Sequence, residues 1–135
     1  MDNKKTKAYD EVWKKYDEND NLIYSKNSNG DEYWYEYDKN NNVIHHKDSD
    51  GFEYWKEYDE KGNEIYYKDS NGDEKWYKYN ENNNIVHFKN SDGDEEWYKY
   101  DENNNMIHYK DSSGYEYWNE YDKKGNLIYR KRLIN

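Results

Sequence analysis

The sequence of 135 residues contains no cysteine and no proline, and only one alanine. The absence of cysteine excludes disulfide bonds, thiolate metal ligands and cysteine nucleophiles. Aliphatic residues are also scarce, since only 32% of the residues are hydrophobic and aromatic side chains make up most of that share. A domain with a conventional aliphatic core is therefore not expected. No long apolar run follows the first residues, so we expect neither a secretory leader nor a membrane span, and a cytoplasmic protein.

Aromatic and charged residues dominate what is present. The chain has 19 Tyr, 6 Trp and 2 Phe, and 39% of its residues are charged, with a formal net charge of −10. Low hydropathy combined with high net charge is typical of disordered chains, but such chains contain few aromatic residues. We therefore predict a folded protein that is held together by aromatic side chains.

The sequence repeats with a period of 21 residues, which Trp marks at 13, 34, 55, 76, 97 and 118. The series of Tyr from Tyr16, Asn from Asn21, Lys from Lys26 and Glu from Glu11 keep the same period in all six copies. Repeats of this length indicate an array of identical supersecondary units. We expect a polar leader over residues 1–8 and a single repeat domain over residues 9–135.

Each repeat contains two turn signals separated by short extended runs. The first signal is Asn-Gly or a relative of it, as at Asn29-Gly30, and it predicts a two-residue type I′ hairpin turn. The second is an Asx-rich segment such as residues 17–21, and it predicts a type I turn closed by a bulge. Two turns per repeat predict an all-β protein, an antiparallel meander of about 12 short strands made of six hairpins.

These two turn types also predict which side chains share a face of the sheet. They place His46 opposite both Trp34 and Trp55, so that every Trp lies on one side. Bulged turns at both signals would instead alternate the Trp side chains between the two sides. On this register one face carries Glu32, Trp34, Glu36, Ile44 and His46, and the other carries Tyr33, Tyr35, Tyr37, Val43, His45 and Lys47.

Neither predicted face is clearly more apolar than the other, which argues against a two-layer sandwich. We therefore expect an extended, twisted single-layer sheet or superhelical ribbon, stabilised by cross-strand aromatic and ion pairs. The alternative is the same meander closed into a barrel, which would remove the edge strands.

The segments Tyr58–Ile65 and Tyr121–Ile128 have the pattern Tyr-Asp-x-x-Gly-Asn-x-Ile. This pattern resembles the tandem hairpin repeats of Tyr-Asp and MORN-like proteins. The resemblance implies an extended, repetitive surface for protein interaction. The regular spacing of Trp and Tyr is also similar to that of choline-binding cell-wall repeats, which implies carbohydrate or cell-wall binding as an alternative.

The sequence offers little for catalysis or metal binding. His45, His87 and His108 occupy one position of the repeat that holds Tyr in other copies, so structural roles are expected for them. Segments such as Asp69–Glu74 resemble calcium loops, but their Gly is fourth rather than sixth, and an Asx-capped turn explains them equally well. We predict a protein that is not an enzyme and that needs no cofactor and no metal.

The charge distribution indicates the kind of partner. Residues 29–120 hold 24 acidic and 10 basic residues, so direct binding of nucleic acid is not expected. An acidic, aromatic ribbon suits a basic groove of a protein that handles nucleic acid. The sequence favours a monomeric inhibitor of a nuclease or CRISPR effector, of the anti-CRISPR or toxin-immunity kind, in the host cytoplasm if phage-encoded. A general scaffold for protein interaction and a carbohydrate-binding repeat stay open as alternatives.

Positions that differ between repeats are the candidate contacts with a partner, because the shared residues are needed for the fold. The candidate partner-binding residues are Tyr33, Tyr35, Tyr54, Tyr67, Tyr77, Phe88, Tyr98, Tyr109, Tyr117, Asp73, Glu74, Asp94, Glu95 and Glu96. His46, Phe52 and Tyr115 occupy similar varying positions.

Overall fold

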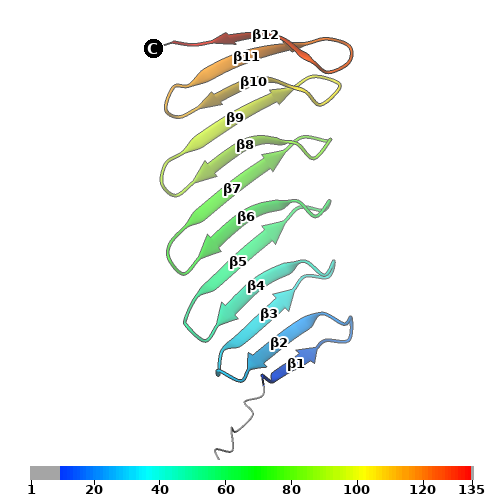
Figure 1. Ribbon diagram of the computed structural model, residues 1–135, viewed down its shortest axis with the longest axis vertical. Helices are drawn as coiled ribbons and strands as arrows, with labels where there is room; N and C mark the ends of the chain where they lie inside the picture. Colours follow the sequence, from blue (N-terminus) through cyan, green and yellow to red (C-terminus); the bar gives the residue numbers. More distant parts are fainter. Residues whose placement is uncertain (1–9, 135) are drawn as a thin grey trace, which may run out of the picture. The chain divides into compact units, whose positions relative to one another are not determined.

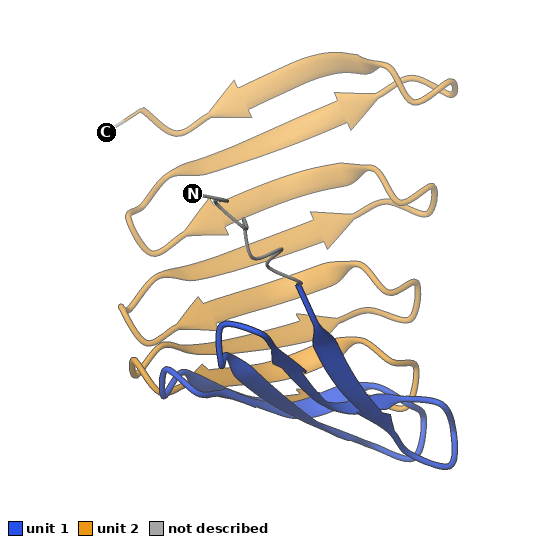
Figure 2. Ribbon diagram, turned by 60° about the horizontal axis from the view of Figure 1, so that its bottom comes forward, with its two compact units in different colours: residues 1–55 blue, residues 56–135 orange. Residues whose placement is uncertain are grey.

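The computed structural model describes residues 10–134, so the predicted leader over residues 1–8 lies outside the described residues. The chain divides into two compact units, residues 1–55 and residues 56–135 (Figure 2). Strand β5 contains the boundary between them.

The described residues form twelve antiparallel strands that follow one another in chain order (Figure 1). Strands β1 and β12 each have one neighbour, so the sheet is open and the alternative of a closed barrel is wrong. The prediction of an antiparallel meander of hairpin repeats is confirmed. No helix long and apolar enough to cross a membrane occurs between residues 10 and 134. The strands are β1 (Val12–Tyr16), β2 (Leu22–Asn27), β3 (Glu32–Tyr37), β4 (Val43–Asp48), β5 (Glu53–Tyr58), β6 (Glu64–Asp69), β7 (Glu74–Tyr79), β8 (Ile85–Asn90), β9 (Glu95–Tyr100), β10 (Met106–Asp111), β11 (Glu116–Tyr121) and β12 (Leu127–Arg132).

The Asx-rich turns have the predicted geometry. In the turn between β3 and β4 the amide of Asn41 donates to the carbonyl of Asp38, and Asn41 has a φ of 63°. The Oδ1 atom of Asp38 accepts hydrogen bonds from the amides of Asn40 and Asn42, at 2.8 and 2.9 Å. Asn tolerates this left-handed conformation and the carboxylate satisfies the turn amides, so the residue types account for the turn.

The Asn-Gly and Asp-Gly turns differ from the prediction. Between β4 and β5 the amide of Gly51 donates to the carbonyl of Asp48, and Gly51 alone has a positive φ, of 92°. A type I′ turn needs a positive φ at Asp50 as well, so the prediction of type I′ turns was wrong. The observed turn is type I followed by a bulge at the glycine.

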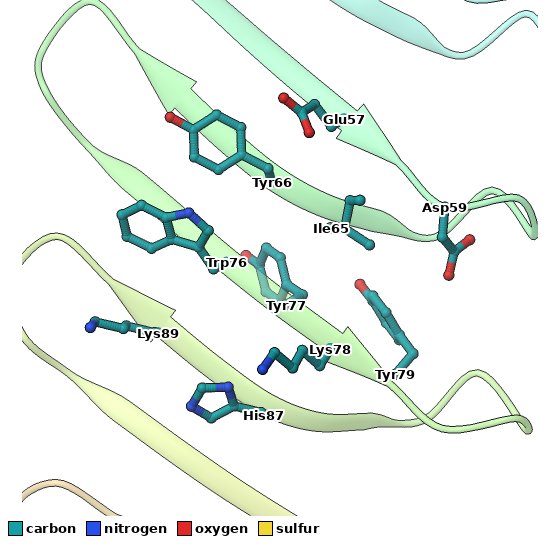
Figure 3. A pocket seen from close by; sticks show the side chains of 10 residues that line it. All are labelled: Glu57, Asp59, Ile65, Tyr66, Trp76, Tyr77, Lys78, Tyr79, His87 and Lys89. Atoms are coloured by element: carbon teal, nitrogen blue, oxygen red, sulfur yellow. The ribbon is translucent and has the colours of Figure 1, made fainter.

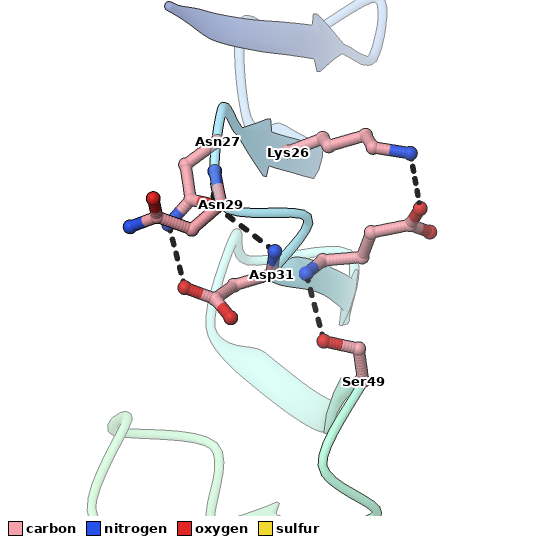
Figure 4. Close-up of polar contacts among 6 residues, drawn as sticks. Lys26, Asn27, Asn29, Asp31 and Ser49 are labelled. Carbon is pink, nitrogen blue, oxygen red and sulfur yellow. Dashed lines mark hydrogen bonds and ion pairs between the residues drawn. The ribbon is translucent and has the colours of Figure 1, made fainter. Parts of the chain in front are cut away.

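A side-chain acceptor at the start of these turns explains the preference. In the turn between β2 and β3, Oδ1 of Asn27 accepts hydrogen bonds from the amides of Asn29 and Asp31, both at 3.0 Å (Figure 4). Beside this turn Lys26 of β2 forms an ion pair with Glu32 of β3. The amide of Glu32 donates to the hydroxyl of Ser49, which lies in the turn between β4 and β5. The acceptor residue favours the type I form, in which only the glycine carries the strained φ.

A further bulge restores the alternation of side chains. Tyr37 pairs with Val43, whereas Glu36 pairs with His45, so Ile44 is an extra residue in β4. The same shift lies between Lys78 and Tyr79 in the pairing of β7 with β8, where Val86 is the extra residue. This bulge compensates for the bulged glycine turn, and the Trp side chains stay on one face although both turns are bulged.

The faces of the even-numbered strands are therefore reversed relative to the prediction. Lys47 pairs with Trp34 and His45 pairs with Trp55, while His46 pairs with Tyr35 and Tyr54. The prediction that His46 faces the Trp residues was wrong, because it did not include the bulge at Ile44. We call the side that carries the Trp residues, His45 and Lys47 with their equivalents the Trp face. The opposite side, which carries Tyr33, Tyr35 and His46 with their equivalents, is the Tyr face.

The tyrosine at the end of β3, β7, β9 and β11 bonds the backbone beside the bulge of the preceding strand. The hydroxyl of Tyr37 donates to the carbonyl of Leu22, and that of Tyr79 donates to the carbonyl of Glu64, both at 2.8 Å. Tyr100 and Tyr121 make the equivalent bonds. The repeated tyrosine is thus a structural residue that satisfies a carbonyl beside the bulge.

Among the described residues no hydrophobic side chain is fully buried. The most buried residues are polar, namely His46, Asp69 and Asn119, which are 9%, 6% and 5% exposed. All three lie on the Tyr face. This face is therefore the better packed side of the sheet in both units.

Candidate functional site

The nine aromatic candidates all lie on the Tyr face. Cross-strand pairing within the units places them in adjacent positions, as for Tyr77 with Phe88 and for Tyr98 with Tyr109. Three of the nine belong to residues 1–55 and six to residues 56–135. They occupy three positions of each repeat, which we call the varying slots. The first holds Tyr33, Tyr54, Lys75, Glu96 and Tyr117, the second holds Tyr35, Lys56, Tyr77, Tyr98 and Asn119, and the third holds His46, Tyr67, Phe88, Tyr109 and Arg130.

In the first unit the varying slots form a cluster around His46. Its ring lies 4.8 Å from the ring of Tyr35, 5.0 Å from that of Tyr54 and 6.2 Å from that of Tyr33. The Nδ1 atom of His46 is buried and has no hydrogen-bond partner. Burial among rings of this kind fixes the positions of the tyrosines, since each ring packs against the imidazole.

In the second unit Tyr67 lies between two cations. The ammonium groups of Lys56 and Lys75 are 5.8 and 5.4 Å from the centre of its ring. Its hydroxyl donates to Oδ2 of Asp69 at 3.0 Å. Burial alone would raise the pKa of Asp69, but the bond from Tyr67 and those from the amides of Asp73 and Asn71 hold it below its ordinary value. Lys56 is also paired with Glu64, at 2.8 Å between Nζ and Oε2, so the ring of Tyr67 is held among charges of both signs.

The following strands present a ring cluster with negative charge. Tyr109 packs against Tyr98 at 5.3 Å and against Tyr117 at 5.2 Å between ring centres. The hydroxyl of Tyr98 donates to the carboxylate of Glu96. Burial, together with the neighbouring carboxylate of Glu96, raises the pKa of both Tyr98 and Tyr109 well above the ordinary value of a tyrosine. Both hydroxyls therefore stay protonated and act as donors or acceptors.

The last strand closes this face with an arginine. The guanidinium of Arg130 lies 4.8 Å from the centre of the Tyr117 ring, and its Nε atom donates to Oδ1 of Asn119 at 2.7 Å. Asn119 in turn donates to the carbonyl of Met106. The varying slots thus differ in charge from repeat to repeat while their side chains are held in place by neighbours.

The acidic candidates are not brought together. Asp73 and Asp94 lie in turns, whereas Glu74 and Glu95 lie on the Trp face, where they pair with Lys68 at 3.2 Å and His87 at 2.7 Å. Only Glu96 shares the Tyr face with the aromatic candidates. A single acidic patch made of all five residues is therefore absent from the described part of the chain.

The negative charge of the second unit is concentrated in the turns. Within residues 56–135 the strands hold nine acidic and ten basic residues, whereas the turns hold nine acidic and three basic ones. Many of these acids stabilise turns. The carboxylate of Asp59, for example, accepts bonds from the amides of Lys61 and Asn63. Hydrogen bonds from the side chain and the amide of Asn63 lower its pKa, so it stays ionised at neutral pH.

The Trp face keeps Trp, Lys and Glu at three positions of every repeat, and its other two positions vary between Tyr and His and between Glu and Lys. Each central Trp packs against a Tyr or a His of the preceding strand, as Trp76 does with Tyr66 at 5.7 Å and Trp97 with His87 at 5.6 Å. Where the partner is Tyr, the Glu of the next strand pairs with Lys. Where it is His, the Glu pairs with Nε2 of that His, at 2.7 Å for His87. Either residue therefore leaves the Glu with a partner, Lys in the Tyr repeats and His in the others, which accounts for the presence of Tyr or His at this position.

A shallow groove of about 1100 Å³ lies in the second unit (Figure 3). Sequence reasoning did not identify it, because its residues come from four strands and one turn. Trp76, Tyr66 and Ile65 form its apolar part, and Lys78 and His87 lie beside them (Figure 3).

Between residues 10 and 134 there is no group of three His, Asp or Glu side chains that could hold a metal ion.

No family model matches the sequence, and no curated protein matches it. Solved structures do match. The crystal structures of TcdB2-TccC3-Cdc42 and TcdB2-TccC3-TEV each align with a TM-score of 0.70 and 18% identity, over 87% of this chain and 7% of theirs. The structure of a Photorhabdus luminescens Tc holotoxin pore aligns equally well over 6% of its chain. The chain therefore has a β-hairpin repeat fold that resembles a small part of these toxins.

Proposed function

We propose that this chain is a non-enzymatic protein-binding module and that the Tyr face is its binding surface. The observation that carries the proposal is where the repeats differ. The three varying slots all lie on the Tyr face. The Trp face keeps Trp, Lys and Glu at three of its positions in all six repeats. Residues needed only for the fold stay the same in every copy, whereas residues that recognise a partner have a reason to differ.

The physical character of the Tyr face supports protein binding. Tyrosine combines a large ring with a polar hydroxyl, and tyrosine and arginine are enriched at the energetic centres of interfaces. The rings around Tyr109 and His46 are already held by their neighbours. Side chains that are ordered before binding lose less conformational entropy when a partner docks.

Within this function we propose that the partner is a basic protein that handles nucleic acid. The chain would then act as an inhibitor of a nuclease or a CRISPR effector, of the anti-CRISPR or toxin-immunity kind. The net charge of −10 supports this narrower proposal. Carboxylates in the turns would speed the encounter with a basic surface, and the rings between the turns would provide the lasting contacts.

A photoreactive phenylalanine analogue placed at two adjacent positions of β9 tests the binding face. Tyr98 lies on the Tyr face and Trp97 lies on the Trp face. In extracts of the source cells, we expect a defined protein to be crosslinked from position 98 and not from position 97. Equal crosslinking from both positions, or from position 97 alone, would contradict the proposal.

The identity and behaviour of the captured protein separate the narrower proposals. A nuclease or RNA-guided complex that loses activity on binding, and that binds more slowly in about 0.5 M salt, supports the inhibitor. A partner of another kind, whose activity does not change, supports a general interaction scaffold. Retention on cell-wall glycan, with no protein captured, favours the carbohydrate-binding alternative.

A further inference from the structure

The two edge strands of the sheet each lack a neighbour on one side. Within residues 10–134, strand β1 pairs only with β2, and β12 pairs only with β11. Trp13 on β1 is 50% exposed, compared with 38% for Trp34, because among the described residues only β2 covers β1. Tyr129 on β12 is 53% exposed. Unpaired edges with exposed rings are templates for pairing with another strand.

Where an even-numbered strand carries Tyr opposite the Trp of the next odd-numbered strand, the contacts between the two strands follow one rule. Tyr24 of β2 pairs with Trp34 of β3, and the two rings are 5.7 Å apart. Two residues later, Lys26 pairs with Glu32, with 2.8 Å between Nζ and Oε1. The interface of β6 with β7 has the same two pairs.

The free edges present the two halves of this interface. Strand β12 carries Tyr129 and Lys131 at the positions of Tyr24 and Lys26. At the other end, Trp13 and Glu11 stand at the positions of Trp34 and Glu32. Neither Lys131 nor Glu11 has a salt-bridge partner within residues 10–134. The repeat rule would pair Tyr129 with Trp13 and Lys131 with Glu11.

We propose that the protein binds a second copy of itself head to tail, with β12 of one molecule adding to β1 of the next. Because this contact joins two different edges, each added copy leaves one edge of each kind free, so the association closes into a ring or continues as a chain. The inference goes beyond the proposed function, since it concerns the edges of the sheet and not its Tyr face.

Charge supports this pairing and opposes the pairing of two copies of β12. Three consecutive basic residues, Arg130 to Arg132, lie on β12, and Asp10 and Glu11 precede β1. In the proposed register Arg132 would lie opposite Asp10, and Arg130 opposite Val12, so no like charges meet. Two copies of β12 would instead bring their basic residues together, which costs stability.

Sedimentation velocity of the full chain over a series of concentrations tests the proposal. We expect association that increases with concentration. Either single substitution, Glu11→Lys or Lys131→Glu, should weaken the affinity between copies at least tenfold. An equimolar mixture of the two single variants should associate again, because each altered edge then meets its complement. The chain that carries both substitutions should also associate.

Matched controls place the same charge changes away from the edges. Glu18→Lys and Lys124→Glu alter turn residues and should leave the association unchanged. Three results would overturn the proposal: a chain that stays monomeric up to about 1 mM, single variants that associate like the parent, or a mixture and a double variant that both stay monomeric. Circular dichroism shows whether each variant keeps its strands.

Discussion

Polar side chains of single residues do much of the structural work in this protein, because few apolar residues are available. In every described turn an Asp or Asn accepts hydrogen bonds from turn amides, as Asp38 does from Asn40 and Asn42. The hydroxyl of each repeated Tyr from Tyr79 onward satisfies a carbonyl beside a bulge. These bonds fix the backbone where the ladder of the sheet is interrupted.

Tyr79→Phe isolates the contribution of one such hydroxyl. The substitution leaves the carbonyl of Glu64 without its partner, at 2.8 Å in the structure. We expect the free energy of unfolding to fall by about 0.5–1.5 kcal/mol, as measured by denaturant titration. Tyr16→Phe is the matched control, since the hydroxyl of Tyr16 has no acceptor in the described residues. A loss of the same size in both variants would contradict the assigned role.

The turn carboxylates predict a dependence of stability on acid pH. Hydrogen bonds from Asn42, Asn63 and Asn105 hold the pKa of Asp38, Asp59 and Asp101 below the ordinary value of 3.8. A lowered pKa in the folded state means that the stabilisation is present above the unfolded pKa and is lost as the pH falls through the folded one. Stability should therefore decrease between about pH 5 and pH 2.

Replacing these three Asp residues with Asn tests the origin of that decrease. Asn80 already occupies the equivalent position and accepts bonds from the amides of Asn82 and Asn84. We expect the triple variant to melt near the parent temperature at pH 7 and to lose less stability on acidification, in thermal melts at both pH values. The converse change, Asn80→Asp, should increase the sensitivity to acid. A triple variant that is as acid-sensitive as the parent would refute the explanation.

At the scale of strands and turns, the structure depends on three bulged positions per repeat acting together. The two turns and the bulge at Ile44 each shift the alternation of side chains, and their combination returns Trp to the same face. The positions of strands and turns could be predicted from the 21-residue period. The bulge could not, because Ile44 is a β-branched residue that suits a regular strand equally well. The sequence does contain one sign of the bulge, the repeated Tyr, whose hydroxyl donates to a carbonyl beside the bulge of the preceding strand.

The turn between β6 and β7 distinguishes the observed geometry from a type I′ turn. Gly72 has a φ of 93° and open space around its Cα, so Gly72→Ala should cost about 1–2 kcal/mol through backbone strain alone. Asn71 has no positive φ, so Asn71→Ala should change the free energy of unfolding by less than about 0.5 kcal/mol. Denaturant titration of both variants measures this. An equal, large loss for Asn71→Ala would support the type I′ turn instead.

At the scale of the whole molecule, the chain is a repeated sheet in which the three varying slots lie on one face and the constant Trp, Lys and Glu lie on the other. The aromatic candidates could be found from the sequence, because they are the positions at which the repeats differ. Their placement on one face could not be predicted, since it depends on the bulge that moves His46, Tyr67, Phe88 and Tyr109 away from the Trp residues. The acidic candidates could not be placed from the sequence, because charge alone does not indicate the face of a sheet. They lie on both faces and in the turns.

The claim that the Tyr face binds the partner is tested most directly by exchanging residues that the repeats themselves allow. A Tyr-face variant carries Lys75→Tyr, Phe88→Tyr and Glu96→Tyr, because Tyr occupies each of these slots in another repeat. A Trp-face variant carries Lys78→Glu, His87→Tyr and Lys99→Glu, which are allowed on the same grounds. Calorimetric titration with the partner captured from position 98 measures the affinity of each.

We expect the Tyr-face variant to bind at least tenfold more weakly and the Trp-face variant to bind like the parent, with both proteins folded. Unchanged affinity in the Tyr-face variant, with a loss in the Trp-face variant, would contradict the account.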